Sequence, residues 1–112
     1  MHPICEDRIL VVDDDNISRA LHRRILAKKF DVVTASSGPE ALNLFDAMKP
    51  HLVLMDAEMP GMDGYETSAE IRRRSNVPII FVTGNTSIEE HLKAYDSDGT
   101  GLLTKQNKKR II

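Results

Sequence analysis

Short apolar runs alternate with helical patterns along the chain. The clearest run, Ile9 to Val12, is followed at once by three aspartates, so it predicts a buried strand that ends at an acidic cluster. Five strands separated by helices are typical of an α/β sheet in which most strands run parallel. The runs predict strands at about 9–12, 31–35, 51–55, 77–82 and 101–104.

Helical periodicity fills the segments between these strands. The first helix places Ile17, Leu21 and Ile25 on one face. The second begins at the segment 37–40, where a proline and an acid suit the first turn, and Pro50 stops it. The loop 59–64 is rich in proline and glycine and precedes the third helix. Helices are predicted at about 16–29, from 37 up to Pro50, from 64 to about 74, at 87–95, and as a stub over 106–112.

Composition narrows the class of protein. A chain of 112 residues with 41% hydrophobic residues suits one domain with a single core. Fifteen basic and 17 acidic residues give a net charge of −2, which argues against a general binder of nucleic acids or membrane surfaces. The single cysteine, Cys5, excludes a disulfide framework, and neither a membrane span nor a signal-peptide core is seen. We therefore expect a soluble, cytoplasmic protein.

Polar side chains follow the carboxyl ends of four predicted strands. They are Asp13 and Asp14, then Asp56, Thr83 and Lys105. Right-handed crossovers bring these ends to one edge of a parallel sheet, where ligands bind. Carboxylate oxygens suit Mg²⁺, and a metal, a lysine and a hydroxyl together can hold phosphoryl oxygens. A carboxylate can itself be the nucleophile, so the edge is suited to phosphoryl transfer through an aspartyl phosphate.

The sequence resembles the receiver domain of two-component response regulators, the family that includes the single-domain chemotaxis regulator. The resemblance spans residues 8–106 and implies a flavodoxin-like, doubly wound sheet in the order 2-1-3-4-5 with helices on both faces. It implies one receiver domain over 1–112, with a truncated last helix at 106–112. The matching segments are Val11-Val12-Asp13-Asp14, Leu54-Met55-Asp56, Met59-Pro60-Gly61-Met62-Asp63-Gly64, Val82-Thr83 and Thr104-Lys105.

The resemblance also implies a role for each site residue. Asp56 would accept a phosphoryl group from a phosphohistidine on a sensor histidine kinase or phosphotransfer protein. Asp14, Asp56 and the backbone carbonyl of Glu58 would bind Mg²⁺, with Asp13 acting mostly through a metal-bound water. The result would be a phosphorylation-controlled switch that catalyses only its own phosphorylation and dephosphorylation.

Two further residues would contact the phosphoryl group. Thr83 would hydrogen-bond to it and shift with it, and Lys105 would pair with another of its oxygens. Asp15 falls outside the family's acid pair, and we expect it near the start of the first helix, where its charge favours the helix dipole.

The sequence departs from the family pattern near its C-terminal end. Gln106 follows Lys105 where the family has a proline, and Leu102 stands where the family has an aromatic residue that moves on activation. Only seven residues follow Lys105, so a short last helix would leave apolar surface on the sheet and the first helix uncovered. We expect either a piece of a larger protein or a homodimer formed through this region.

Two other functions remain possible from the sequence. A phosphatase resembling the haloacid dehalogenases would use Asp13 as nucleophile and Asp15 as the acid two residues later. A receiver-like interaction module would keep the fold without phosphotransfer, although the intact acid set argues against it.

Overall fold

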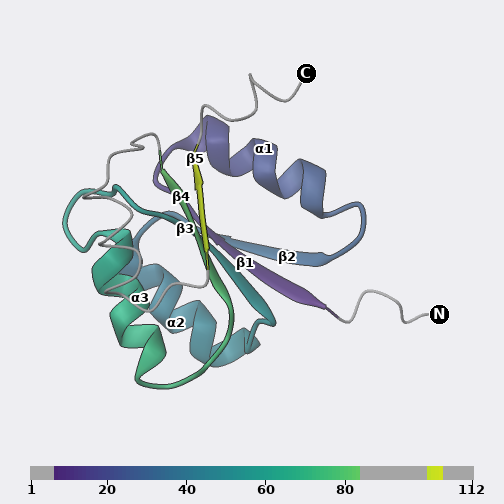
Figure 1. Cartoon of the computed structure of the whole chain (residues 1–112). Helices are drawn as coiled ribbons and strands as arrows, with labels where there is room; N and C mark the ends of the chain where they lie inside the picture. Colours follow the sequence, from purple (N-terminus) through teal and green to yellow (C-terminus); the bar gives the residue numbers. More distant parts are fainter. Residues whose placement is uncertain (1–6, 84–100, 105–112) are drawn as a thin grey trace.

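The computed structural model describes residues 7–83 and the strand at 101–104, so the helices predicted at 87–95 and 106–112 lie outside the described residues. Figure 1 shows the arrangement of the elements. In chain order they are β1 (Arg8–Val12), α1 (Asn16–Leu26), β2 (Asp31–Ala35), α2 (Gly38–Met48), β3 (Leu52–Asp56), α3 (Gly64–Arg72), β4 (Ile79–Thr83) and β5 (Gly101–Thr104).

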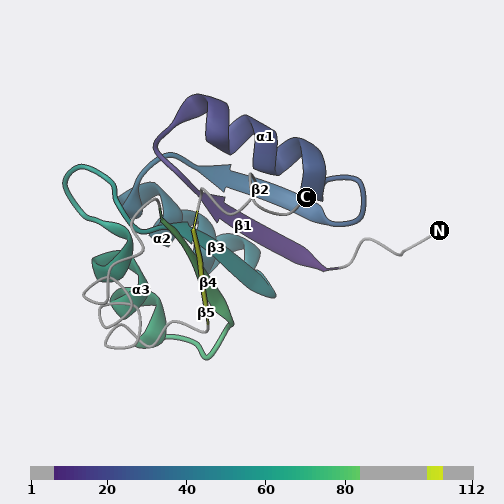
Figure 2. The same cartoon turned by 45° about the horizontal axis from the view of Figure 1, so that its top comes forward.

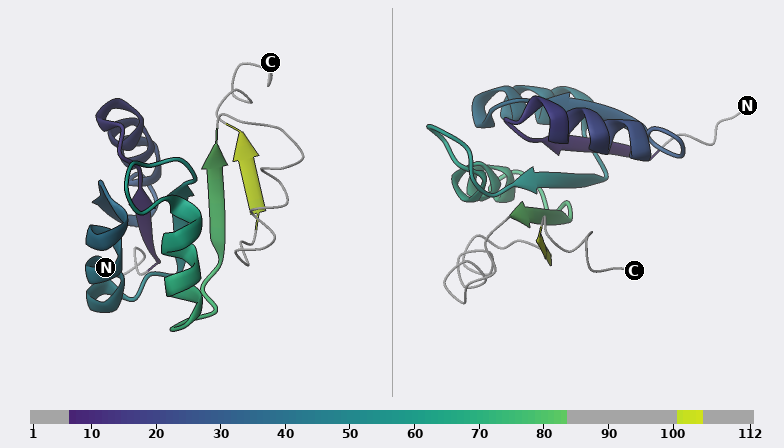
Figure 3. Two further views of the ribbon diagram at one scale, coloured as in Figure 1. Left: turned by 90° about the vertical axis from the view of Figure 1, so that its left-hand side faces the viewer. Right: turned by 90° about the horizontal axis from the view of Figure 1, so that it is seen from above.

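The strands form one five-stranded sheet in the order β2-β1-β3-β4-β5. Every neighbouring pair is parallel, so all carboxyl ends lie at one edge. The arrows of β4 and β5 point the same way in the left view of Figure 3. The predicted fold class and strand order are therefore confirmed, with β1 and β3 next to each other in the sheet.

Helices cover both faces of the sheet. α1 packs against β1 and β2, whereas α2 and α3 pack against each other and against β1, β2 and β3. Figures 1 and 2 show α1 on the opposite side of the sheet from α2 and α3. This is the doubly wound arrangement that right-handed crossovers produce.

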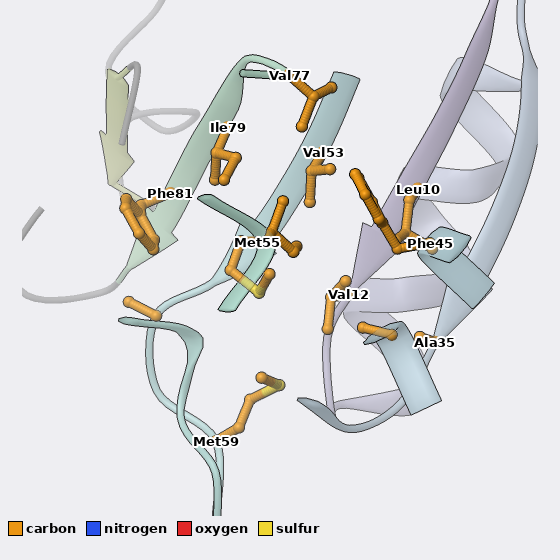
Figure 4. Packing of buried hydrophobic residues seen from close by; sticks show 13 residues of the cluster. Leu10, Val12, Ala35, Phe45, Val53, Met55, Met59, Val77, Ile79 and Phe81 are labelled. Atoms are coloured by element: carbon orange, nitrogen blue, oxygen red, sulfur yellow. The ribbon is translucent and has the colours of Figure 1, made fainter. Parts of the chain in front are cut away.

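The main hydrophobic core lies between the sheet and the pair α2 and α3. Alternate residues of β1, β3 and β4 point into it, as the twofold periodicity of a strand requires. Phe45 from α2 reaches into this core, and Phe81 and Met55 lie along the sheet (Figure 4). The tilted rings of Tyr65 and Phe81, with centroids 4.8 Å apart, join α3 to β4.

The helix α1 lies on the opposite face of the sheet, against β1 and β2. No residue of α1 is fully buried. The apolar face that the sequence predicts for it is present but exposed: Ile17 is 79%, Leu21 39% and Ile25 56% exposed. The apolar stripe of α1 therefore contributes little to the core.

Some element boundaries differ from the prediction by a few residues. α1 ends at Leu26 rather than near Lys29, because the backbone N–H groups of Lys29 and Phe30 both donate to the Leu26 carbonyl and close a turn. β4 begins at Ile79 rather than at 77, because Pro78 has no N–H to donate to the sheet. α3 likewise ends at Arg72, and the next two residues form a turn.

The start of α2 is as predicted, and its end has a specific cause. Ser37 is the N-cap, and its side chain accepts from the Glu40 N–H. Lys49 caps the other end in a left-handed conformation, with φ of 49°, immediately before Pro50. A non-glycine residue in this conformation is uncommon, and here it turns the chain toward β3.

Two isoleucines allow a buried position in the main core to be compared with an exposed position on α1. We expect Ile71→Ala in α3 to lower the free energy of unfolding by about 2–5 kcal/mol, because it leaves a cavity in the main core. Ile25→Ala in α1 is the matched control and should cost less than about 1 kcal/mol, because the side chain is 56% exposed. Urea unfolding measures both; equal losses would contradict this account of the core.

Candidate functional site

The register of β1 and β3 places two carboxylates beside each other. Val12 pairs with Met55, so the next residues, Asp13 and Asp56, leave the sheet side by side. Each is only 2% exposed. Asp14 is exposed, and carboxylate oxygens of all three acids lie within 4.8 Å of one another. The predicted convergence of Asp13, Asp14 and Asp56 is therefore confirmed.

Asp13 is fixed by three hydrogen bonds. Its N–H donates to the Ala35 carbonyl at 3.0 Å, which extends the pairing of β1 with β2. Its carboxylate accepts from the Asp15 N–H at 2.9 Å. Its carbonyl accepts from the guanidinium of Arg19 at 2.8 Å. These hydrogen bonds hold the backbone in one conformation at the start of the acid cluster.

Asp15 has a different task from its two neighbours. It is the N-cap of α1, and its side chain accepts from the Ser18 N–H at 2.9 Å. Asp15 is not among the three acids that come together. Its predicted place at the start of the first helix is confirmed, whereas the phosphatase hypothesis, in which Asp15 acts beside Asp13, is not supported.

Backbone contacts hold Asp56 and the loop after it close to the sheet. The Asp56 carboxylate accepts from the Glu58 N–H at 3.2 Å, which turns the chain sharply beyond β3. The Gly64 N–H donates to the Ala57 carbonyl at 3.1 Å. A Cβ on Gly64 would lie 2.1 Å from the carbonyl oxygen of Asp56, so only glycine allows α3 to begin this close to the site.

A capping box fixes the other end of this loop. The Asp63 carboxylate accepts from the Glu66 N–H at 2.9 Å, and the Glu66 carboxylate accepts from the Asp63 N–H at 3.0 Å. The buried hydroxyl of Thr67 donates to the Asp63 carbonyl at 2.8 Å. The loop that carries Glu58 is therefore anchored at both ends.

The two remaining predicted site residues follow β4 and β5. Thr83 is the last residue of β4, and its backbone pairs with Thr104 at the end of β5. The carboxyl ends of these strands thus lie at the same edge as Asp13 and Asp56. Lys105 lies outside the described residues, and the roles of Thr83 and Lys105 stay predictions.

The sequence analysis missed a basic residue beside the acid cluster. Arg19, in the second turn of α1, is half-buried and donates to the carbonyl of Asp13. The pKa of Glu40 is lowered by the N–H and the hydroxyl of Ser36, and the positive charge of Arg19 adds to this effect. One signal in the sequence could have pointed to this residue. It is an arginine near the N-terminus of a helix, where the helix dipole makes a positive charge unfavourable.

The donor set fits Mg²⁺. Asp13, Asp14 and Asp56 offer carboxylate oxygens, which this ion prefers, and a few carboxylates with several waters are its usual ligands. Sulfur and imidazole donors, which zinc favours, are not part of the cluster. The carbonyl of Glu58, two residues beyond Asp56, completes the predicted ligand set and stays a prediction.

Comparison with known proteins identifies the class. The family of response regulator receiver domains matches residues 9–112, so the chain belongs to that family. A probable transcriptional regulator, ycf27, from Porphyra purpurea is 46% identical over 79 residues, which are 70% of this chain and 32% of that protein. The regulatory protein VanRB of Enterococcus faecalis is 31% identical over 104 residues, 93% of this chain and 47% of that protein.

Solved structures agree with the fold. The chemotaxis protein CheY4 of Vibrio cholerae has a TM-score of 0.84 at 26% identity, over 95% of this chain and 98% of that one. The beryllofluoride-activated receiver domain of RstA from Klebsiella pneumoniae also has a TM-score of 0.84, at 29% identity, over 88% and 86% of the two chains.

The family defines what kind of protein this is. Receiver domains are signalling switches of two-component systems rather than enzymes that turn over a metabolite, and they bind Mg²⁺ in an acidic pocket. The chain spans less than half the length of the curated relatives named above. Within the described part of the chain, no helix has the length and apolar character needed to span a membrane.

Two glycines after β3 allow the cost of steric crowding to be distinguished from the cost of backbone strain. We expect Gly64→Ala to lower the free energy of unfolding by about 1–3 kcal/mol, because the added methyl group meets the Asp56 carbonyl. Gly61→Ala is the control: φ is +74° there, but no atom lies within 4 Å, so the cost should be about 1 kcal/mol. A larger loss at Gly61 in urea unfolding would refute the close approach at Gly64.

Mg²⁺ should raise the stability of the fold, because it binds the native acid cluster and not the unfolded chain. At about five times its dissociation constant the gain is roughly 1 kcal/mol, or about 4–8 °C in melting temperature for a small domain. Asp14→Asn should melt higher than the wild type without metal, since one charge of the cluster is gone, and should gain less from Mg²⁺. Thermal melts with Mg²⁺ or EDTA test this, and a wild-type melting temperature indifferent to Mg²⁺ would contradict it.

Proposed function

We propose that Asp56 is the phosphoacceptor of this receiver domain. The observation that carries the proposal is the meeting of the Asp56 carboxylate with those of Asp13 and Asp14 at the carboxyl edge of the sheet. Asp56 ends β3, which lies between β1 and β4, so the acids after β1 and the threonine ending β4 flank it from both sides.

The proposed reaction moves a phosphoryl group from nitrogen to oxygen. An oxygen of the Asp56 carboxylate forms the new bond to phosphorus, the bond from phosphorus to the imidazole nitrogen breaks, and that nitrogen keeps the electron pair. A bound Mg²⁺ would offset the charge of the carboxylates and of the phosphoryl oxygens. Asp14, Asp56 and the Glu58 carbonyl would hold it, with Asp13 contributing through water.

The remaining residues would hold the transferred group. The Thr83 hydroxyl would donate to one phosphoryl oxygen, and the ammonium group of Lys105 would pair with another. Their support comes from sequence position and, for Thr83, from the end of β4 at the edge of the acid cluster. Catalysis would consist mainly of positioning and charge neutralisation, which is what phosphoryl transfer requires.

Receiver domains interact with histidine kinases or phosphotransfer proteins, and we propose one of these as the donor for this chain. Self-phosphorylation by small phosphate donors and slow self-dephosphorylation belong to the same proposal. A cytoplasmic location, the lack of direct contact with nucleic acids or membranes, and a homodimer through the C-terminal region stay predictions. The matched family does not support the phosphatase or the interaction module.

Substitution of the acceptor gives the sharpest test. The protein is incubated with acetyl phosphate and Mg²⁺, quenched in acid, and the modified residue is located by mass spectrometry. We expect labelling at residue 56 in the wild type and its complete loss in Asp56→Asn. Asp13→Asn is the matched control, since it removes the same charge from a neighbouring buried position and should slow labelling without abolishing it.

The opposite pattern would overturn the assignment. Labelling that persists in Asp56→Asn and disappears in Asp13→Asn would make Asp13 the nucleophile. Beryllofluoride, which stands in for a phosphoryl group, supplies a second measurement: it should bind only when Mg²⁺ and Asp56 are both present.

A further inference from the structure

Arg19 bridges the start of α1 and the backbone of the acid cluster. One nitrogen of its guanidinium donates to the Asp13 carbonyl at 2.8 Å, and the other donates to the side chain of Asn16. The backbone N–H of Arg19 donates to the backbone carbonyl of Asp15 at 2.9 Å. Both prongs of the planar guanidinium are thus used, which fixes its orientation.

The contact with Asp13 has a consequence for Asp14. The carbonyl of Asp13 and the N–H of Asp14 belong to the same planar peptide group. Holding this carbonyl therefore sets the direction in which the chain enters Asp14, whose side chain is exposed and has no burial to fix it. Asp13 is already held by its N–H and its carboxylate, so Arg19 supplies the third constraint.

The positive charge of Arg19 and its hydrogen bonds have opposite effects on the binding of a cation at the acid cluster. A guanidinium stays protonated in proteins, so its positive charge beside the acids is permanent. Its field reaches Glu40 at the start of α2, where it helps to lower the pKa of that carboxyl after the larger effect of Ser36. A fixed positive charge weakens the binding of a cation nearby, whereas correct orientation of the ligands strengthens it.

We propose that Arg19 is a positioning residue for the metal site, which orients Asp14 by holding the carbonyl of Asp13. This inference rests on the proposed function, since it concerns the Mg²⁺ site of the phosphoacceptor. In the apo protein Arg19 keeps the site assembled, and it does so without contacting the metal or the phosphoryl group.

The opposing effects make the test decisive. Arg19→Met removes the donors and the charge and keeps an unbranched side chain suited to a helix. If positioning dominates, the dissociation constant for Mg²⁺ rises by about tenfold, at the lower end of what loss of an outer-shell partner costs. If Arg19 is only a nearby positive charge, Mg²⁺ binds more tightly to the variant.

Arg23→Met is the matched control. Arg23 lies one turn further along α1, is exposed, and has the same charge, so its loss should leave the dissociation constant within about twofold. Mg²⁺ alone is titrated into each 112-residue protein, and binding is followed through backbone amide shifts. Unchanged or tighter binding in Arg19→Met, relative to this control, would overturn the proposal.

A second variant keeps the proposal testable if Arg19→Met does not fold. Arg19→Lys keeps the charge but replaces two prongs with one ammonium group, so we expect about threefold weaker binding than in the wild type. Arg23→Lys is its control. Wild-type affinity in Arg19→Lys, with Arg19→Met unfolded, would count against positioning.

Failure of the proposed function looks different from failure of this inference. If the wild type shows no saturable binding of Mg²⁺, or if Asp14→Asn leaves binding unchanged, the metal site itself is wrong and Arg19 has nothing to position. If the wild type binds Mg²⁺ through Asp14 and Arg19→Met binds equally well, only the role of Arg19 is refuted.

Discussion

Crowding of like charge at one edge of a parallel sheet is the constraint on which the rest of this structure depends. Asp13 and Asp56 are adjacent because Val12 pairs with Met55, and both are almost fully buried. Two like charges 4 Å apart repel by about 4 kcal/mol at an effective dielectric constant near 20. That is a large share of the 5–15 kcal/mol by which a typical domain is stable, so the cluster favours a bound cation.

The surroundings of the cluster keep the acids from moving apart. The sheet holds the backbone on one side, and the close approach of Gly64 to the Asp56 carbonyl holds it on the other. The capping box of α3 fixes the loop that follows. Side chains near the site thus serve mainly to hold backbone atoms in place. The positions of the carboxylates follow from the path of the backbone.

The sequence allowed the sheet and the meeting of three acids to be predicted, because the end of each strand has a short local signal, whereas the order of the strands was implied by the resemblance to the receiver family. An apolar run that stops at Asp13 or Asp56 marks a strand end, and parallel topology then brings those ends together. Helix ends were less predictable: the turn after Leu26 depends on where β2 must begin, which no local pattern states. The missing N–H of Pro78 could have given the start of β4.

The contact between Arg19 and Asp13 could not be predicted from the periodicity of apolar and polar residues. Its partner is a backbone carbonyl six positions away, and a carbonyl has no identity in a sequence. The residue type predicts which side chains are charged. Which backbone carbonyl such a side chain contacts depends on the path of the folded chain. For the same reason, the resemblance to a family could assign Thr83 and Lys105 but could not bring in Arg19.

α1 differs from the other helices in how it is held. None of its residues is fully buried, and two polar contacts hold its first turns: the cap by Asp15 and the bridge from Arg19 to Asp13. Segments with few buried apolar contacts open more easily than the core of a domain. A change in charge at the acidic edge would therefore act directly on the polar contacts that hold the start of α1.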